Sequence, residues 1–180
     1  YYTLGQAFRA RPGQRVIISG GLGQMGYTTS AVLGAASADP SRRVIGLTGD
    51  GSLQTNLHDL SVLAHHGFNA ALVVVNNAGY GAFGEFKDSA LAPELAMMQL
   101  NMNTVVVLTK LFMPDLLATR GKILNTASTA AFQPGPYMAV YYATKSFVLS
   151  FSEAIASELE DTGVTVTALC PGPTASGFQD

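Results

Sequence analysis

Short runs of β-branched residues alternate along this chain with longer segments of helical periodicity, and this alternation constrains the fold more than any other feature. The pattern is typical of a sheet of parallel strands joined by helices. Each run leads into a turn that contains Gly, Asn or Ser, and open α/β sheets bind their ligands at such carboxyl ends. The predicted strands are Arg15–Ser19, Arg43–Thr48, Ala71–Asn76, Lys122–Thr126 and Val164–Leu169.

Helices are predicted between these strands, over Met25–Ala36, Leu57–His66, Pro93–Leu117 and Val140–Glu160. The last helix carries an apolar stripe that we expect to be its core face. The stripe consists of Val140, Ala143, Phe147, Phe151, Ala154, Ile155 and Leu159. With 180 residues the chain fits one α/β domain, residues 1–180. The expected fold is a three-layer, Rossmann-like, doubly wound parallel sheet of about five strands.

Composition excludes several classes of function. A net charge of −2 without a Lys/Arg cluster argues against nucleic-acid binding. The apolar runs are shorter than the roughly 18 residues of a membrane helix, and a single cysteine fits a reducing cytoplasm. Only 12% of the residues are charged, so we expect either buried sheet faces together with an oligomer interface, or apolar surface that is exposed because partner segments are missing. Because the chain begins at Tyr1 and stops shortly after a Pro-Gly loop, we also expect a fragment.

A first motif links Gly49-Asp50-Gly51-Ser52, after one predicted strand, to Asn76-Asn77 at the end of the next. Mg²⁺ prefers oxygen ligands and phosphate oxygens together, and Asp50, Asn77 and the carbonyl of Gly79 offer such oxygens. Residues 14–81 resemble the diphosphate-binding domain of thiamine-diphosphate enzymes of the acetolactate synthase kind. That resemblance implies thiamine diphosphate and Mg²⁺ as ligands. In that family a glutamate from a separate domain activates the cofactor, and this chain has no room for such a domain.

A second motif begins at the same asparagines and continues through Asn101, Ser128 and the segment "YYATK" with Tyr141 and Lys145. Tyr141 and Lys145 are four residues apart and so share one face of a helix. A lysine ammonium beside a phenol favours the phenolate, which allows Tyr141 to exchange a proton with a substrate oxygen. Ser128, at a strand end, is placed to hydrogen-bond the same oxygen. Tyr142 competes for the catalytic role, but its register predicts that it packs.

Residues 76–180 resemble a short-chain dehydrogenase/reductase, through "NNAG", the four side chains just named and "CPGP" at Cys170–Pro173. The resemblance implies NAD or NADP as cofactor and interconversion of an alcohol and a carbonyl by hydride transfer. It assigns Asn101, Ser128, Tyr141 and Lys145 to catalysis, with Asn101 relaying protons through water. Contacts with the nicotinamide carboxamide or the adenosine are implied for Pro171, Gly172, Thr174, Asn77, Ala78 and Gly79.

The first half also offers a glycine-rich turn, Gly20, Gly23 and Gly26, between a predicted strand and a helix. A helix N-terminus in that context binds pyrophosphate. Asp50 follows at a distance suited to a ribose-binding acid, which favours NAD. The spacing differs from the reductase pattern, which places its middle glycine where Gln24 stands.

Two family resemblances therefore meet near residues 73–82, with the thiamine-enzyme-like part over 1–75 and the reductase-like part over 76–180. The preferred interpretation is an NAD(P)-dependent oxidoreductase acting on a small molecule, truncated or impaired. The alternatives are a thiamine-diphosphate/Mg²⁺-binding fragment of a lyase or transferase, and an inactive chimeric α/β domain. Self-association is expected through helices 93–117 and 140–160, because they resemble those through which these reductases dimerise. The substrate is left open, as is the choice between NAD and NADP.

Overall fold

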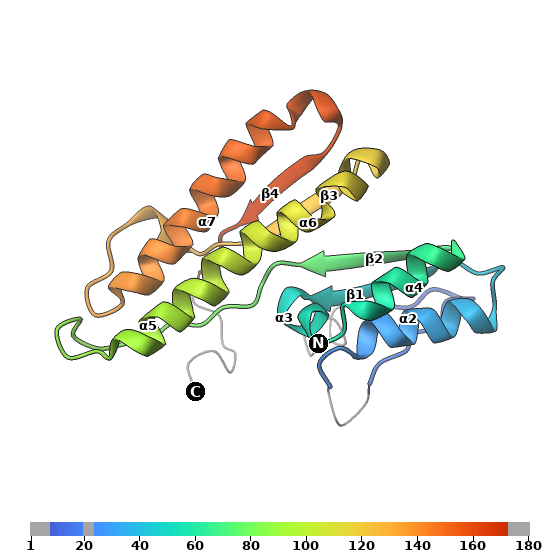
Figure 1. Ribbon diagram of the computed structural model, residues 1–180, viewed down its shortest axis with the longest axis horizontal. Coiled ribbons are helices and arrows are strands. Elements are labelled where there is room, and N and C mark those ends of the chain that lie inside the picture. Colours follow the sequence, from blue (N-terminus) through green and yellow to red (C-terminus); the bar gives the residue numbers. More distant parts are fainter. Residues whose placement is uncertain (1–7, 20–23, 173–180) are drawn as a thin grey trace. The chain divides into compact units, whose positions relative to one another are not determined.

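The computed structural model describes residues 8–19 and 24–172 (Figure 1). The chain divides into two compact units, Tyr1–Val73 and Val74–Asp180. The boundary lies within the strand β2 (Ala70–Val75), at the start of the segment where the two sequence resemblances meet.

The first unit packs helices on the strand β1 (Val44–Gly49), which lies beside β2 with the two arrows pointing the same way in Figure 1. The amide of Val44 donates to the carbonyl of Asn69 at 2.9 Å. Close packing of α2 on β1 requires Gly46, because a Cβ there would lie 2.5 Å from Val32 Cγ2. The helices of this unit are α2 (Tyr27–Ala38), α3 (Asp50–Gln54) and α4 (His58–His66).

Two expectations for the first unit are wrong. Residues 14–19 have no regular structure, although Arg15–Ser19 was predicted as a strand. Val16, Ile17 and Ile18 are each more than half exposed. A β-branched run becomes a strand through pairing and packing, and these residues bury little of their surface. The turn expected at Asp50 is a short helix, α3. The described residues therefore hold four strands, compared with about five expected.

The sheet of the second unit pairs β3 (Lys122–Thr126) in parallel with β4 (Thr165–Leu169). The register runs from Lys122 opposite Thr165 to Thr126 opposite Leu169. On the other side of β3, Asn76 forms a parallel bridge with Asn125. The chain that leaves β2 is thus bonded to β3, and the carboxyl ends of these segments meet at one edge, as the sequence predicted.

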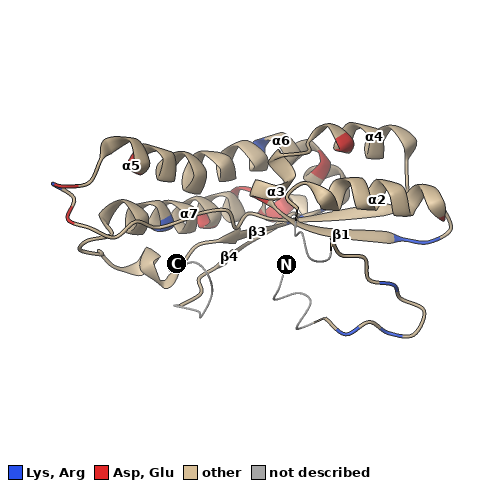
Figure 2. Cartoon of the chain, turned by 90° about the horizontal axis from the view of Figure 1, so that it is seen from below, with Lys and Arg blue, Asp and Glu red and all other residues tan. Residues whose placement is uncertain are grey.

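The helices of the second unit are α5 (Leu91–Met98), α6 (Thr104–Thr119) and α7 (Ala139–Glu158). A π-helical segment, η2 (Gln99–Asn103), joins α5 to α6. The helix predicted over Pro93–Leu117 is therefore interrupted, and π turns of this kind are frequent at functional sites. Short 3₁₀ turns, η3 (Thr129–Phe132) and η4 (Glu160–Thr162), flank α7. Figure 2 shows α6 and α7 on the same side of β3 and β4.

The apolar stripe predicted for the last helix is only partly its core face. The buried residues of α7 are Thr144, Lys145, Val148 and Ser152. From the stripe, Phe147 and Phe151 stack on each other and pack against the core cluster of Val105, Ala127 and Val148, whereas Ala143 and Ala154 are exposed. Helix α7 therefore faces the sheet with a largely polar surface.

Residues Leu91–Thr119 form a continuous helical run of 29 residues that is long and apolar enough, by length and composition alone, to cross a membrane. The apolar runs of the sequence predicted no such segment. A single helix of this kind is weak evidence, since helices of soluble proteins pass the same test. Of the most apolar 18-residue stretch of this run, 28% is buried inside the protein. The exposed apolar side chains of this run include Leu91, Leu95, Met98, Val107, Leu111 and Leu117.

A buried chain of amide and hydroxyl groups ties the sheet of the second unit to α7. Asn76 Nδ2 donates to Asn125 Oδ1 at 2.8 Å, and Asn125 Nδ2 donates to Ser152 Oγ at 2.9 Å. Ser152 Oγ in turn donates to the carbonyl of Val148 at 2.7 Å. Asn125 is fully buried, so the loss of its side chain would leave both neighbours short of a partner.

We predict that Asn125→Ala lowers the free energy of unfolding by about 2 to 4 kcal/mol, because a buried polar group without a partner costs about 1 to 3 kcal/mol. Urea denaturation followed by circular dichroism measures the change. Thr165→Ala, at an exposed position of β4, is the matched control and should change stability by less than about 0.5 kcal/mol. Equal stabilities for the two variants would contradict the role given to Asn125.

Candidate active site

Lys145 is a buried cation at the carboxyl end of β3. Its side chain is 6% exposed, and its Nζ donates to the carbonyl of Thr126, the last residue of that strand, at 2.8 Å. The same Nζ lies 5.9 Å from the centroid of the Tyr141 ring, within the range of a cation–π contact. The structure thus brings Tyr141 and Lys145 together on α7, as their four-residue spacing predicts.

Asn101 lies in the π-helical segment and is 1% exposed. Its Oδ1 accepts from the amide of Tyr80 at 3.2 Å, and its Nδ2 donates to the carbonyl of Tyr80 and to Thr144 Oγ1, each at 3.0 Å. The side chain therefore fastens the segment after the NNAG motif to both η2 and α7. Asn101 holds the backbone of the site in place.

Gly79 occupies the space between Asn101 and Lys145. A Cβ at this position would lie 2.9 Å from Asn101 Oδ1 and 3.7 Å from Lys145 Nζ. Because the Asn101 side chain is buried and bonded at both ends, it has little freedom to move aside. The glycine of the NNAG motif is thus required for the close approach of this loop to the lysine.

Ser128 is half-buried, directly before the 3₁₀ turn η3. Its Oγ accepts from the amide of Ala130 at 3.1 Å. A hydroxyl oxygen that accepts in this way retains its own proton to donate. The strand end that positions Ser128 is the same one that supplies the carbonyl for Lys145.

Tyr141 is half-buried and its ring lies against Gly81, where an added Cβ would be 3.2 Å from the ring. The neighbouring Tyr142 packs over Gly135, at 2.3 Å from an added Cβ there. This arrangement confirms the prediction that Tyr142 packs. The rings of Tyr141 and Tyr142 therefore pack against different glycines, Gly81 and Gly135.

Thr144, inside the "YYATK" segment, is a site residue that the sequence analysis missed. It is fully buried, accepts from Asn101 and donates from Oγ1 to the carbonyl of Tyr141 at 2.7 Å. Its position between Tyr141 and Lys145, on the inner side of the helix, was the available signal. Thr144 links α7 to the π-helical segment.

Of the remaining residues predicted to contact the cofactor, some follow β4, some follow Asn76 and others lie outside the described residues. Pro171 follows β4, and its carbonyl accepts from the amide of Thr129 at 3.0 Å. At Gly172 an added Cβ would meet Thr129 Cγ2 at 4.0 Å, so the space beside it is open. Asn77 is exposed and Ala78 is half-buried. The predicted residues Gly20, Gly23 and Thr174 lie outside the described residues.

Gly26 and Asp50 belong to the first unit. Gly26 has a φ of 80°, and a Cβ there would lie 2.6 Å from Thr55 Oγ1, so only glycine fits. It lies at the N-terminus of α2, beside a cavity of about 630 Å³ that Ser30 and Asn56 also line. Asp50 is fully buried at the start of α3. The predicted metal ligands Asp50, Asn77 and Gly79 are thus divided between two units.

We predict that Gly79→Ala lowers the free energy of unfolding by about 1 to 3 kcal/mol, because the added methyl group overpacks a filled space. The amide signal of Tyr80 in an NMR spectrum should shift as its bond to Asn101 lengthens. Gly84→Ala is the matched control, since an added Cβ there meets no atom within 4 Å. Unchanged stability and an unchanged Tyr80 amide in Gly79→Ala would show that the close approach is unimportant.

Comparison with known proteins gives both sequence and structural relatives. HetN, a ketoacyl reductase of Nostoc sp., is 33% identical over 101 residues, which are 56% of this chain and 35% of that protein. The D-beta-hydroxybutyrate dehydrogenase of Cupriavidus necator is 29% identical over 164 residues, 91% of this chain and 62% of that enzyme. The chain thus spans about one to two thirds of the length of these relatives.

A short chain dehydrogenase from Burkholderia cenocepacia, solved in complex with NADP, superimposes with a TM-score of 0.59 at 25% identity. The superposition covers 69% of this chain and 53% of that one. This likeness supports the expected Rossmann-like α/β fold with parallel strands.

The sequence profile described as short chain dehydrogenase matches residues 9–180. This range includes residues 14–81, so the interpretation of the first half as part of a thiamine-diphosphate enzyme, and with it the join of two families, is not supported. Among the described residues, no group of three or more His, Cys, Asp or Glu side chains is arranged to hold a metal ion. This chain belongs to the short chain dehydrogenase family.

Proposed function

We propose that this protein is an NAD(P)-dependent oxidoreductase that interconverts an alcohol and a carbonyl in a small-molecule substrate, with Tyr141 as the general acid and base. The observation that carries the proposal is the position of the Lys145 ammonium. It is buried at the end of β3 and lies 5.9 Å from the Tyr141 ring centroid. A buried positive charge beside a phenol stabilises the phenolate relative to the phenol.

In the direction of oxidation, Tyr141 Oη accepts the proton of the substrate hydroxyl. Ser128 Oγ donates a hydrogen bond to the same substrate oxygen and so holds it beside Tyr141. Lys145 places a positive charge beside the Tyr141 ring, 5.9 Å from its centroid. A nicotinamide bound here would accept the hydride that leaves the carbinol carbon. Asn101 and Thr144 keep the helix segments that carry these groups at a fixed spacing.

The residues present fit a nicotinamide dinucleotide. In the second unit, Gly79 keeps a Cβ out of the space beside Lys145, and Gly172 has open space beside it. We assign Asn77, Ala78, Gly79, Pro171, Gly172 and Thr174 to contacts with the cofactor. The related Burkholderia cenocepacia enzyme was solved with NADP, and either NAD or NADP is compatible with this proposal.

We predict that Tyr141→Phe lowers kcat by about 10² to 10⁴-fold, the usual contribution of a general acid or base. Oxidation of small secondary alcohols such as 2-butanol and 1-amino-2-propanol, with NAD or NADP, is followed by the absorbance of the reduced nicotinamide. Titration with NADH and NADPH, followed by fluorescence, should show that the variant still binds the cofactor.

Tyr142→Phe is the matched control, because it removes the same hydroxyl from the adjacent residue. It should retain activity within a few-fold of the unchanged protein. Loss of activity in Tyr142→Phe with retention in Tyr141→Phe would exchange the roles of the two tyrosines. Failure to bind either nucleotide would overturn the proposed function.

We also propose that the protein self-associates through α5, α6 and α7, and that it is cytoplasmic. Figure 2 shows these helices with few charged residues, and Val107 and Leu111 are each more than half exposed. The same helical run contains Lys110 and Asp115, and a charge near the centre of a bilayer costs about 2.5 to 3.5 kcal/mol. Association of two such faces therefore accounts for the exposed apolar residues better than insertion into a membrane.

We predict that Leu111→Glu shifts the protein toward a monomer by at least tenfold in dissociation constant, because each copy would bury a carboxylate without a partner. Sedimentation velocity over a range of concentrations measures the shift. Val62→Glu, an equivalent change on α4, should leave the association unchanged. A monomeric unchanged protein would refute self-association.

A further inference from the structure

A small cavity of the second unit lies where the loop after Gly81 meets the segment that leads into α7. Its volume is about 50 Å³. Phe83, Phe86 and Tyr137 are among its lining residues, each more than half exposed, and Phe83 and Tyr137 stack with their ring centroids 5.6 Å apart. The amide of Gly84 donates to the carbonyl of Tyr137 at 2.8 Å, so the two sides of the cavity are bonded to each other.

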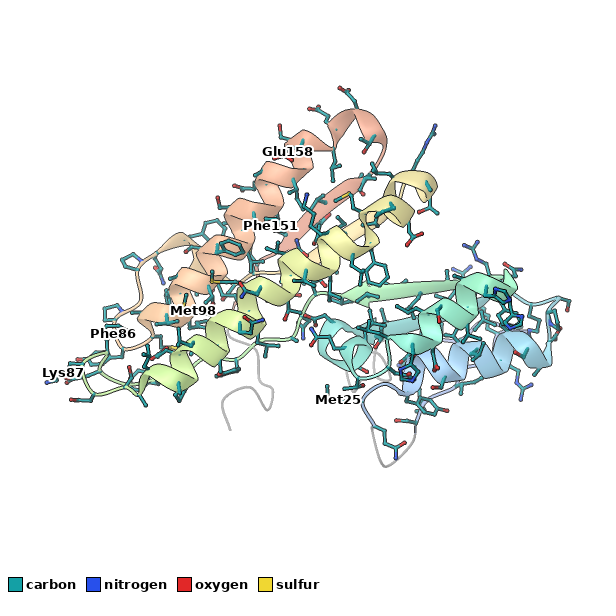
Figure 3. The ribbon with its side chains drawn as sticks, viewed as in Figure 1. Met25, Phe86, Lys87, Met98, Phe151 and Glu158 are labelled. Atoms are coloured by element: carbon teal, nitrogen blue, oxygen red, sulfur yellow. The ribbon has the colours of Figure 1, made fainter. Side chains whose placement is uncertain are left out.

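Glu94, in the first turn of α5, supplies the acidic group among the residues that line this cavity. Its Oε2 is buried and has no hydrogen-bond partner within the described part of the chain. Lys87, the nearest cation along the sequence, is paired with Glu85 at 2.8 Å. Figure 3 shows Phe86 and Lys87 in the loop before α5. A buried carboxylate oxygen needs a donor, and residues 8–19 and 24–172 provide none for this atom.

The residues on both sides of the cavity are next to Tyr141, either in space or along the chain. On one side the lining residue Ala82 follows Gly81, where an added Cβ would lie 3.2 Å from the Tyr141 ring. On the other side Met138, Ala139 and Val140 line the cavity and lead into Tyr141. The cavity is therefore a neighbour of the residue to which we assign the chemistry, and it opens a place for another part of the substrate.

The backbone beside the cavity is held in an unfavourable conformation. Tyr137 has a φ of 65°, in the left-handed region that bulky residues rarely adopt. Such residues persist where the surrounding structure fixes them, and they gather at ligand sites. Here the conformation goes together with the stacking of the Tyr137 ring on Phe83 and with the bond from Gly84 to the Tyr137 carbonyl.

We propose that this cavity binds a terminal ammonium group of the substrate, which pairs with Glu94 and lies beside the aromatic side chains of the lining. A carboxylate together with aromatic rings is the combination that recognises an ammonium cation. A volume of about 50 Å³ admits one small polar group, since a water molecule occupies about 30 Å³ of liquid. As an account of the substrate, this inference rests on the proposed function, and it names amino alcohols or amino ketones as the class.

The test compares the binding of 1-amino-2-propanol with that of two uncharged analogues, 1,2-propanediol and 2-butanol. Saturation-transfer NMR on the full chain measures the dissociation constants without requiring turnover. The amino alcohol should bind at least tenfold more tightly than either analogue, and Glu94→Gln should abolish that preference. Glu85→Gln is the matched control, because it removes the same charge from an exposed, ion-paired position of the preceding loop.

A second variant separates loss of the site from loss of the fold. Glu94→Leu should reverse the preference in favour of 2-butanol, with an unchanged circular dichroism spectrum. Equal binding of the three compounds, or an equal effect of Glu85→Gln, would overturn the inference. Selective ammonium binding without hydride transfer would refute the proposed function alone, and turnover of alcohols without a preference that depends on Glu94 would refute the inference alone.

Discussion

The polar face of α7 is the constraint on which the second unit depends. A helix that packs on a sheet normally buries apolar side chains, yet α7 buries Thr144, Lys145 and Ser152 beside Val148. Each buried polar group must then find a partner, since an unmet bond costs about 1 to 3 kcal/mol. Asn101, the Thr126 carbonyl and Asn125 are those partners. Their positions fix the helix against the ends of β3 and the π-helical segment.

This arrangement serves the chemistry that we propose. A helix held by apolar contacts alone tolerates small shifts, whereas directed hydrogen bonds at the Thr126 carbonyl and at Asn101 fix the height of Lys145 and of its neighbour Tyr141. The π turn at Gln99–Asn103 contains Asn101, which reaches both Tyr80 and Thr144. Fixed spacing of a proton donor, a cation and a hydroxyl is what general acid–base catalysis requires.

The misleading resemblance of the first half has a physical origin. Parallel sheets of any family place Gly, Asp and Asn at the carboxyl ends of their strands, because ligands and tight turns are found there. The segments Gly49-Asp50-Gly51-Ser52 and Asn76-Asn77 meet that general requirement and so match more than one family. The reductase motif is more specific, because it combines a strand end, a helix face and a glycine loop. The short chain dehydrogenase profile, which matches residues 9–180, separated the two.

The sequence alone determined the alternation of strands and helices, the bounds of β3, and the pairing of Tyr141 with Lys145. These features follow from local periodicity and from spacing within one helix. Contacts between distant segments were decided by the tertiary structure. They include the hydrogen bonds of Asn101 to Tyr80, the burial of Thr144 and the position of the Glu94 carboxylate in the small cavity. The exposure of Val16–Ile18 is also a result of the tertiary structure. Periodicity describes which side of an element is apolar, but only packing decides which polar groups are buried and which partners they meet.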